Sequence, residues 1–113
     1  MKGEYMEIFD YHTEGGKNLI KEYLSSLPII ERTYGYGIRH KITREGLAAF
    51  DGLDTRQLHG KLWEIKFLSN RIMYVIFDKD TVHFLHACKK QKGKAEKINL
   101  YKAIQRAKEH NLL

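Results

Sequence analysis

The sequence predicts a single α+β domain over residues 1–113, in which an N-terminal strand and two helices precede an antiparallel sheet and a C-terminal helix. Two observations predict this class. Apolar residues of the first half recur at the three- and four-residue spacing of amphipathic helices, whereas those of the second half alternate as in strands. A length of 113 residues with 42% hydrophobic content leaves little room for a second domain.

The first half is predicted to form one strand and two helices. Residues 5–11 have a β-rich composition and predict the strand. Residues 17–27 carry apolar side chains at helical spacing, and Pro28 ends this helix because proline disfavours helical geometry in the residue before it. A second helical pattern covers residues 30–50, although two glycines weaken its first half.

The second half is predicted to form three strands and a helix. Residues 61–67 alternate between two sets of side chains, which predicts a strand with two distinct faces. Residues 71–78 predict a second strand, and a tight turn joins it to a third strand over residues 81–88. Residues 95–110 return to helical spacing. The predicted order is therefore β-α-α-β-β-β-α.

Composition excludes several classes of protein. No apolar stretch approaches the roughly 18 to 20 residues that a membrane span needs. The N-terminal residues lack the apolar core and cleavage site of a secretory signal. The single cysteine, Cys88, excludes an intramolecular disulfide and a zinc site of paired thiols. We therefore expect a soluble, cytoplasmic protein with no membrane partner.

The chain carries no motif that predicts a metal ion or a cofactor. His83 and His86 are three residues apart, which on a regular strand places them on opposite faces, and no carboxylate cluster accompanies the other histidines. A hydrolase elbow, a phosphate-binding glycine loop and a dinucleotide fingerprint are all absent. Cys88 ends an apolar strand and is interpreted as a small buried residue rather than a nucleophile.

Positive charge is concentrated in the second half. Residues 61–113 carry 12 Lys and Arg against 5 Asp and Glu, whereas residues 1–60 carry 8 against 9. Within residues 89–97, five lysines accompany one acidic residue. Such a segment indicates a polyanionic partner, with nucleic acid favoured over a membrane surface. An ordinary solvated lysine loop is the alternative.

A group of basic residues surrounds the predicted strands. Lys66 shares a strand face with Glu64, Arg71 opens the next strand, and Tyr74 lies on that same strand. If the strands are neighbours in one antiparallel sheet, these side chains can converge on one surface. The alternative is an exposed salt-bridge network formed by Glu64, Lys66 and Arg71. Three lysines follow the last strand: Lys89, Lys90 and Lys92.

Four segments follow one another in a characteristic order: LWEIK at 62–66, RIMY at 71–74, the apolar strand that ends in the lysine run, and AIQR at 103–106. The order of these segments resembles the RelE superfamily of toxins, and most closely its HigB branch, also called the phage Gp49-like family. In motif order the resemblance covers roughly residues 57–108. It matches Lys66 and Arg71 to the basic pair that the family carries on its central strands.

The resemblance implies a toxin of a type II toxin–antitoxin pair. Such toxins are compact α+β proteins that enter the ribosomal A site and cut messenger RNA without a metal. The implied partner is a HigA-like helix-turn-helix antitoxin, which neutralises the toxin and alone contacts operator DNA. The chain departs from the pattern at Cys88, where members often have phenylalanine, at Lys66, where many have arginine, and at Glu64, where RelE proper has lysine.

On this resemblance we expect the 2′-hydroxyl of the RNA to attack the adjacent phosphate. This reaction needs a base, positive charge at the phosphate and an acid for the leaving 5′-oxygen. We expect Lys66 to act as the base, with Glu64 orienting it or substituting for it. Arg71 would stabilise charge on the phosphate, and Lys90 would protonate or stabilise the leaving oxygen.

Further residues are expected to bind the RNA. Tyr74 would stack on a base, and His86 is a weaker acid–base candidate beside it. The RNA backbone would be held by Lys61, Lys89, Lys92 and Lys94. Two other functions remain open, namely a ParE-like toxin that inhibits DNA gyrase without cutting RNA and a non-enzymatic nucleic-acid-binding module.

Overall fold

The computed structural model describes residues 5–113 and has the predicted α+β architecture, with one strand more than the sequence predicted. No helix within this part of the chain has the length and apolar character needed to cross a membrane. In chain order the elements are β1 (Glu7–Asp10), α1 (Leu19–Ser25), α2 (Ile29–Glu45), the 3₁₀ helix η1 (Gly46–Gly52), β2 (Asp54–His59), β3 (Leu62–Phe67), β4 (Asn70–Asp78), β5 (Thr81–Lys89) and α3 (Lys94–Glu109).

The five strands form one sheet in the order β1-β5-β4-β3-β2. Strands β2 to β5 are antiparallel neighbours joined by short turns, as predicted for the second half. Strand β1 pairs with β5 in parallel, so the sheet is mixed rather than wholly antiparallel. The two helices after β1 carry the chain to the far edge, and three hairpins then return it to β1, which leaves β5 running in the same direction as β1.

The strand that the sequence did not predict is β2, at the edge of the sheet. Its sequence, DTRQLH, has a single apolar residue, and its side chains are exposed or half-buried. An edge strand can form on backbone hydrogen bonds to one neighbour without an apolar pattern of its own. The helix predicted over residues 30–50 ends at Glu45, because Gly46 adopts φ 70° and the chain continues as η1.

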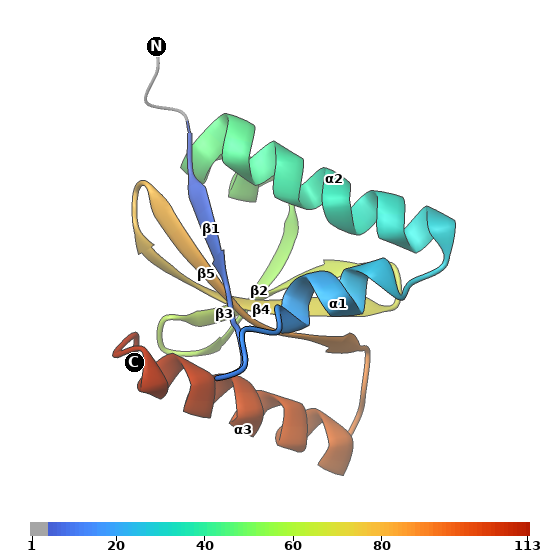
Figure 1. Ribbon diagram of the computed structural model, residues 1–113, viewed down its shortest axis with the longest axis vertical. Helices are drawn as coiled ribbons and strands as arrows, with labels where there is room; N and C mark the ends of the chain where they lie inside the picture. The colour runs from blue at the N-terminus through green and yellow to red at the C-terminus, as the bar shows by residue number, and fades with distance from the viewer. Residues whose placement is uncertain (1–4) are drawn as a thin grey trace.

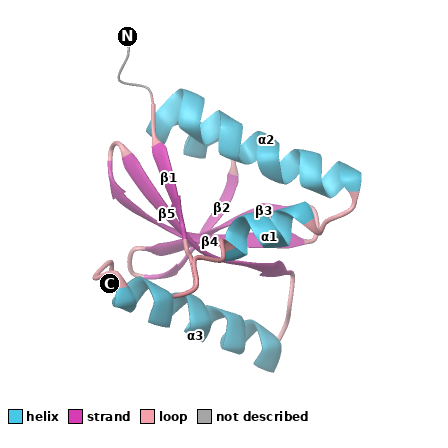
Figure 2. Cartoon of the chain, in the orientation of Figure 1, coloured by secondary structure: helices cyan, strands magenta, loops and turns pink. Residues whose placement is uncertain are grey.

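Helices cover both faces of the sheet. Figure 1 shows α1 and α2 on one face and α3 on the other, and Figure 2 shows the same helix–sheet–helix layering by colour. The alternation in β3 sends Ile65 and Phe67 to the core beneath α1 and α2, and Leu62 to the core beneath α3. The two faces predicted for this strand are therefore confirmed. Glu64 and Lys66 consequently lie on the α3 face.

A buried ion pair joins β1 to α2. The Nη1 and Nη2 atoms of Arg39 donate to the two carboxylate oxygens of Asp10 at 2.7 and 2.8 Å. Asn18, whose side chain caps α1, also donates to Asp10 from its Nδ2 at 2.9 Å. The Asp10 carboxylate thus links three elements on the face of the sheet opposite α3.

Candidate functional site

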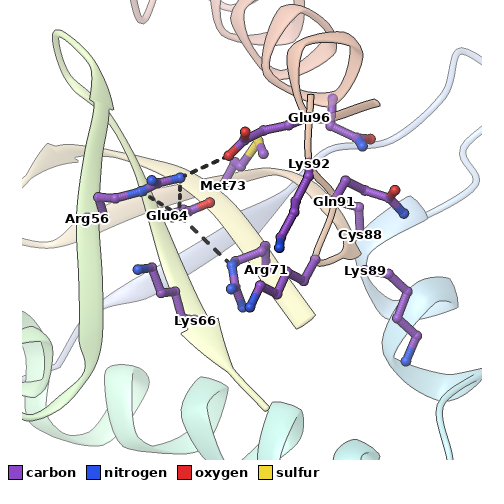
Figure 3. Close-up of a pocket in the computed structure, with 12 residues that line it drawn as sticks. Arg56, Glu64, Lys66, Arg71, Met73, Cys88, Lys89, Gln91, Lys92 and Glu96 are labelled. Atoms are coloured by element: carbon purple, nitrogen blue, oxygen red, sulfur yellow. Dashed lines mark hydrogen bonds and ion pairs between the residues drawn. The ribbon is translucent and has the colours of Figure 1, made fainter. Parts of the chain in front are cut away.

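A groove of about 270 Å³ opens between the C-terminal ends of β3 and β5, the start of β4 and the first turns of α3 (Figure 3). Six cationic side chains and two carboxylates line it, so the groove carries net positive charge. The lining residues are Arg56, Glu64, Lys66, Arg71, Met73, Cys88, Lys89, Lys90, Gln91, Lys92, Glu96 and Asn99.

Strand register brings Lys66 and Arg71 together. Lys66 lies directly opposite Arg71 across the β3–β4 pair, and Arg71 lies opposite Cys88 across β4–β5. Directly opposed residues of antiparallel strands have neighbouring side chains. The hairpin between β3 and β4 therefore places two cations side by side at the floor of the groove.

Glu64 is a buried carboxylate between two arginines. It is only 2% exposed, and the Nε atom of Arg56 donates to its Oε2 at 2.9 Å. The Nε atom of Arg71 lies 4.0 Å from the same oxygen. No hydrogen bond or ion pair joins Glu64 to Lys66 among residues 5–113. The expectation that Glu64 orients Lys66 is therefore corrected, because Glu64 holds the guanidinium groups of Arg56 and Arg71 instead.

Arg71 is held rigidly by the turn that precedes it. Its Nη1 donates to the carbonyl oxygen of Asn70 at 2.9 Å, and the turn contains Leu68 at φ 54°. The side chain is only 14% exposed. These contacts use Nε and Nη1, and within the described part of the chain Nη2 has no partner. A guanidinium group fixed in this way can present a planar fork to a phosphate.

Three lysines of the groove lack a carboxylate partner within residues 5–113. They are Lys66, which is half-buried on β3, and Lys90 and Lys92, which are exposed after β5. In Figure 3 the Lys92 side chain points toward Arg71. The backbone N–H of Lys90 donates to the carbonyl oxygen of Ser69 at 2.8 Å, which fixes the start of this loop against the β3–β4 turn. The groove thus offers several free ammonium groups around one anchored arginine.

The sequence matches the family described as phage-derived protein Gp49-like over residues 22–108. The chain belongs to this Gp49-like family. Gp49-like proteins are a RelE/HigB-like toxin family, so membership is compatible with a toxin of a toxin–antitoxin pair. The matched segment contains every residue that lines the groove, whereas β1 lies outside it. A search of curated proteins finds no match.

Lys89 of this Gp49-like protein points away from the groove centre. Its Nζ lies 3.0 Å from Oε1 of Glu31 on α2, and the Nδ2 of Asn70 donates to the same oxygen at 2.8 Å. These two contacts lower the pKa of Glu31, with the Asn70 hydrogen bond as the larger cause. Figure 3 shows Lys89 directed away from Arg71. Lys89 therefore has to leave Glu31 before it can hold an RNA backbone.

Tyr74 and Lys61 lie outside the groove. Tyr74 is only 2% exposed and stacks on Phe50 at 5.0 Å between ring centroids, on the sheet face covered by α1 and α2. Burial raises the pKa of its hydroxyl to about 12. The proposal that Tyr74 stacks on an RNA base is therefore wrong. Tyr74 lies three residues after Arg71 on β4, so its side chain faces the opposite side of the sheet from the groove. Lys61 precedes β3 at its other end and lines a separate cavity beside Trp63.

His86 is also outside the groove, beneath α3. Its Nδ1 accepts from Nη1 of Arg106 at 3.1 Å, so its Nε2 donates to Oδ1 of Asn99 at 2.7 Å. The side chain is 8% exposed, and burial lowers its pKa to about 4. A neutral imidazole whose two ring nitrogens are both hydrogen-bonded within the protein has no nitrogen free for proton transfer or for binding RNA. The expected acid–base role is therefore corrected.

A bulge in β5 places His83 and His86 on the same face of the sheet, although the sequence predicted opposite faces. Met73 pairs with His86 and Tyr74 pairs with Phe84, which leaves Leu85 as an extra residue. His83 and His86 therefore both face α3, whereas regular alternation would have separated them. The His83 ring lies 6.3 Å from that of His110 at the end of α3.

The burial of neutral His86 predicts a loss of stability at acidic pH. Its pKa falls from 6.5 to about 4 on folding, so below pH 6.5 the unfolded chain binds a proton that the folded chain does not. The contribution of neutral His86 to the free energy of unfolding is fully present above pH 6.5, and up to about 3 kcal/mol of that free energy is lost as the pH falls to 4. Urea denaturation of wild type and His86→Gln at several pH values measures this loss. An equal pH dependence in both proteins, with exposed His59→Gln as control, would contradict this assignment.

Several residues that line the groove were missed by sequence reasoning, among them Arg56, Glu96 and Asn99. Arg56 lies on β2, which was not predicted, and Glu96 and Asn99 lie on the first turns of α3. No local signal identifies Arg56, because its role depends on its register opposite Glu64. Lys94, by contrast, was predicted to hold RNA, and it is exposed at the start of α3 without lining the groove.

The remaining chemistry of the groove is limited. Burial, followed by the charge of Glu64, raises the pKa of the Cys88 thiol to about 11, so the thiol stays protonated at neutral pH. A protonated thiol is a poor nucleophile. Within residues 5–113, no group of three or more His, Cys, Asp or Glu side chains is placed to hold a metal ion. The groove is therefore characterised by fixed positive charge.

Proposed function

We propose that this Gp49-like protein is the toxin of a type II toxin–antitoxin pair and belongs to the HigB branch. In this proposal it is an endoribonuclease that cuts messenger RNA in the ribosomal A site. The observation that carries the proposal is the anchored Arg71, surrounded by lysines without acidic partners in an open groove. Such a groove fits a crowded phosphate whose negative charge increases during cleavage.

The proposed reaction is attack of a 2′-hydroxyl on the adjacent phosphate, with loss of the 5′-oxygen. Lys66, acting in its neutral amine form, takes the hydroxyl proton and becomes an ammonium; it lies beside Arg71, and no carboxylate binds it within residues 5–113. Arg71 binds two oxygens of the phosphate through its planar fork. Lys90 donates a proton to the leaving oxygen, and Lys92 and Lys94 hold the RNA backbone. Glu64 acts indirectly, by positioning Arg71 together with Arg56.

The proposed partners follow from the same family. A HigA-like helix-turn-helix antitoxin would neutralise the toxin, and operator DNA would be contacted only through that antitoxin. The target would be the translating ribosome with its messenger RNA, so the site of action would be the cytoplasm.

Cleavage mapping on a translating message tests the proposed function. Purified protein is added to a translation reaction with ribosomes and, separately, to the same message without them. We expect cuts within the reading frame only when ribosomes are present, and cutting by the Arg71→Ala variant that is slower by about 10²-fold or more. Equal cutting of naked RNA by both proteins would contradict the proposed site. Absence of any cut, together with inhibition of DNA supercoiling by gyrase, would replace the proposal with a ParE-like activity.

A further inference from the structure

The turn between β3 and β4 determines where the Arg71 guanidinium group lies. Phe67 and Asn70 are paired across this turn, so Leu68 and Ser69 form its two-residue loop. The carbonyl oxygens of Leu68 and Asn70 accept from Nη1 of Arg71 at 3.5 and 2.9 Å. A change in the path of the turn would therefore move the guanidinium group relative to the floor of the groove.

The backbone of this turn is strained. Leu68 adopts φ 54°, in the left-handed region that residues with a side chain rarely occupy. Such a conformation persists only where the surrounding contacts hold it. One contact is the hydrogen bond from the backbone N–H of Lys90 to the carbonyl oxygen of Ser69. Another comes from Asn70, whose Nδ2 lies 3.4 Å from the carbonyl oxygen of Phe67 across the turn.

The Asn70 side chain is fully buried, and its amide is bound on both sides. The hydroxyl of Tyr23 on α1 donates to Oδ1 at 2.6 Å, and Nδ2 donates to Oε1 of Glu31 on α2 at 2.8 Å. Mainly through burial, the pKa of the Tyr23 hydroxyl is raised above its usual value, so the hydroxyl stays protonated and donates. Oδ1 has no other donor among residues 5–113. The two helices therefore hold the Asn70 amide in one orientation.

We propose that Asn70 and Tyr23 are positioning residues for Arg71, so that α1 helps to set the geometry at the phosphate. The inference rests on the proposed function, because the position of Arg71 matters only if an RNA phosphate binds in the groove. Neither Asn70 nor Tyr23 lines the groove, so neither touches the substrate. The effect passes through the turn: Tyr23 fixes the amide of Asn70, this amide fixes the strained backbone, and the turn carbonyls fix the guanidinium group.

The first measurement is the heteronuclear nuclear Overhauser effect of the Arg71 Nε–H group, which reports fast motion of that side chain. In wild type we expect a value close to those of the backbone amides in the strands. Tyr23→Phe deletes only the hydroxyl, and we expect the value to fall toward that of the exposed Arg44. Tyr36→Phe is the matched control, because it removes a hydroxyl contact of 2.8 Å with Ser25 between the same two helices. It should leave the value for Arg71 unchanged.

The second measurement is the rate of message cleavage in a double-mutant cycle. We expect Tyr23→Phe to lower the wild-type rate by about fivefold, the equivalent of one hydrogen bond, and Tyr36→Phe to stay within about twofold. Added to Arg71→Ala, Tyr23→Phe should change the residual rate by less than about twofold, because the group that it positions is absent. A general weakening of the fold would instead lower both rates in the same proportion, and thermal melts of each variant report such weakening.

The outcomes separate the inference from the proposed function. An Arg71 side chain that stays as rigid in folded Tyr23→Phe as in wild type would overturn the inference, whether or not the protein cuts RNA. Equal proportional losses of rate in the wild-type and Arg71→Ala backgrounds would also overturn it. A mobile Arg71 in Tyr23→Phe, together with no cutting by wild type, would contradict the proposed function and support the link from Tyr23 to Arg71. Asn70→Ala, which removes the whole amide, should have the larger effect in both measurements.

Discussion

Replacing Arg71 by alanine is expected to lower the rate of message cleavage by about 10²-fold or more. The guanidinium group is already fixed by the Asn70 carbonyl and lies near Glu64, so it costs little reorganisation when charge develops on a phosphate. Arg71→Lys keeps the charge but loses the planar fork, and we expect it to recover only a small part of the rate. The rate of appearance of cut message in a translation reaction, at saturating protein, measures both effects.

The control for this experiment is an arginine of similar chemistry away from the groove. Arg44 lies exposed on α2 and pairs with Glu45 at 3.1 Å, so Arg44→Ala should cut at the wild-type rate. Thermal unfolding of all three variants separates loss of chemistry from loss of fold. Wild-type rates for a folded Arg71→Ala protein would exclude Arg71 from the reaction and would leave the groove without its proposed phosphate ligand.

Replacing Arg39 by alanine is expected to lower the free energy of unfolding by about 3 to 5 kcal/mol. The substitution removes two hydrogen bonds to Asp10, whose side chain is only 4% exposed, and leaves its carboxylate with Asn18 as the remaining side-chain donor among residues 5–113. A buried carboxylate without its cation is far more costly than a broken surface pair. Chemical denaturation monitored by circular dichroism measures the change.

Two further variants test whether burial causes this effect. Lys17→Ala breaks an exposed pair with Glu22 at 3.0 Å and should cost no more than about 1 kcal/mol. The double variant Arg39→Met with Asp10→Leu removes both charges and should recover much of the stability lost in Arg39→Ala. A cost for Arg39→Ala no larger than that of Lys17→Ala would show that the Asp10 carboxylate is well solvated.

The spacing of apolar residues along the chain predicted which side of a helix or strand is buried. The alternation in residues 61–67 correctly assigned the two faces of β3, and the helical spacing of residues 95–110 correctly predicted α3, whose Ala103 and Ala107 pack on the sheet. The same rule applied to Arg71 and Tyr74 would have separated them, because three residues along a strand reverse the face. Tyr74 was instead grouped with the basic residues, and its burial against Phe50 corrects that grouping.

Features that depend on long-range pairing could not be predicted in this way. Arg56 reaches Glu64 only because the polar edge strand β2 pairs with β3, and nothing in the residues around Arg56 indicates a strand. His86 faces α3 only because Leu85 is bulged, which reverses the expected alternation in β5. In both cases the position of the side chain is set by backbone hydrogen bonds to a neighbouring strand. These bonds form whatever the side chains are, so the pattern of side chains does not predict them.

The sequence by itself determined the α+β class, the concentration of positive charge in the second half and the presence of Lys66 and Arg71 on consecutive strands, whereas their pairing as neighbours was shown by the structure. Only the tertiary structure decided which charges meet. It placed Glu64 between Arg56 and Arg71, turned Lys89 toward Glu31, and left Lys66, Lys90 and Lys92 without acidic partners among residues 5–113. The physical reason is that the spacing of apolar residues within one helix or strand predicts which side of that element is buried. Which charged side chains meet in a groove depends instead on the register between segments that are distant in sequence.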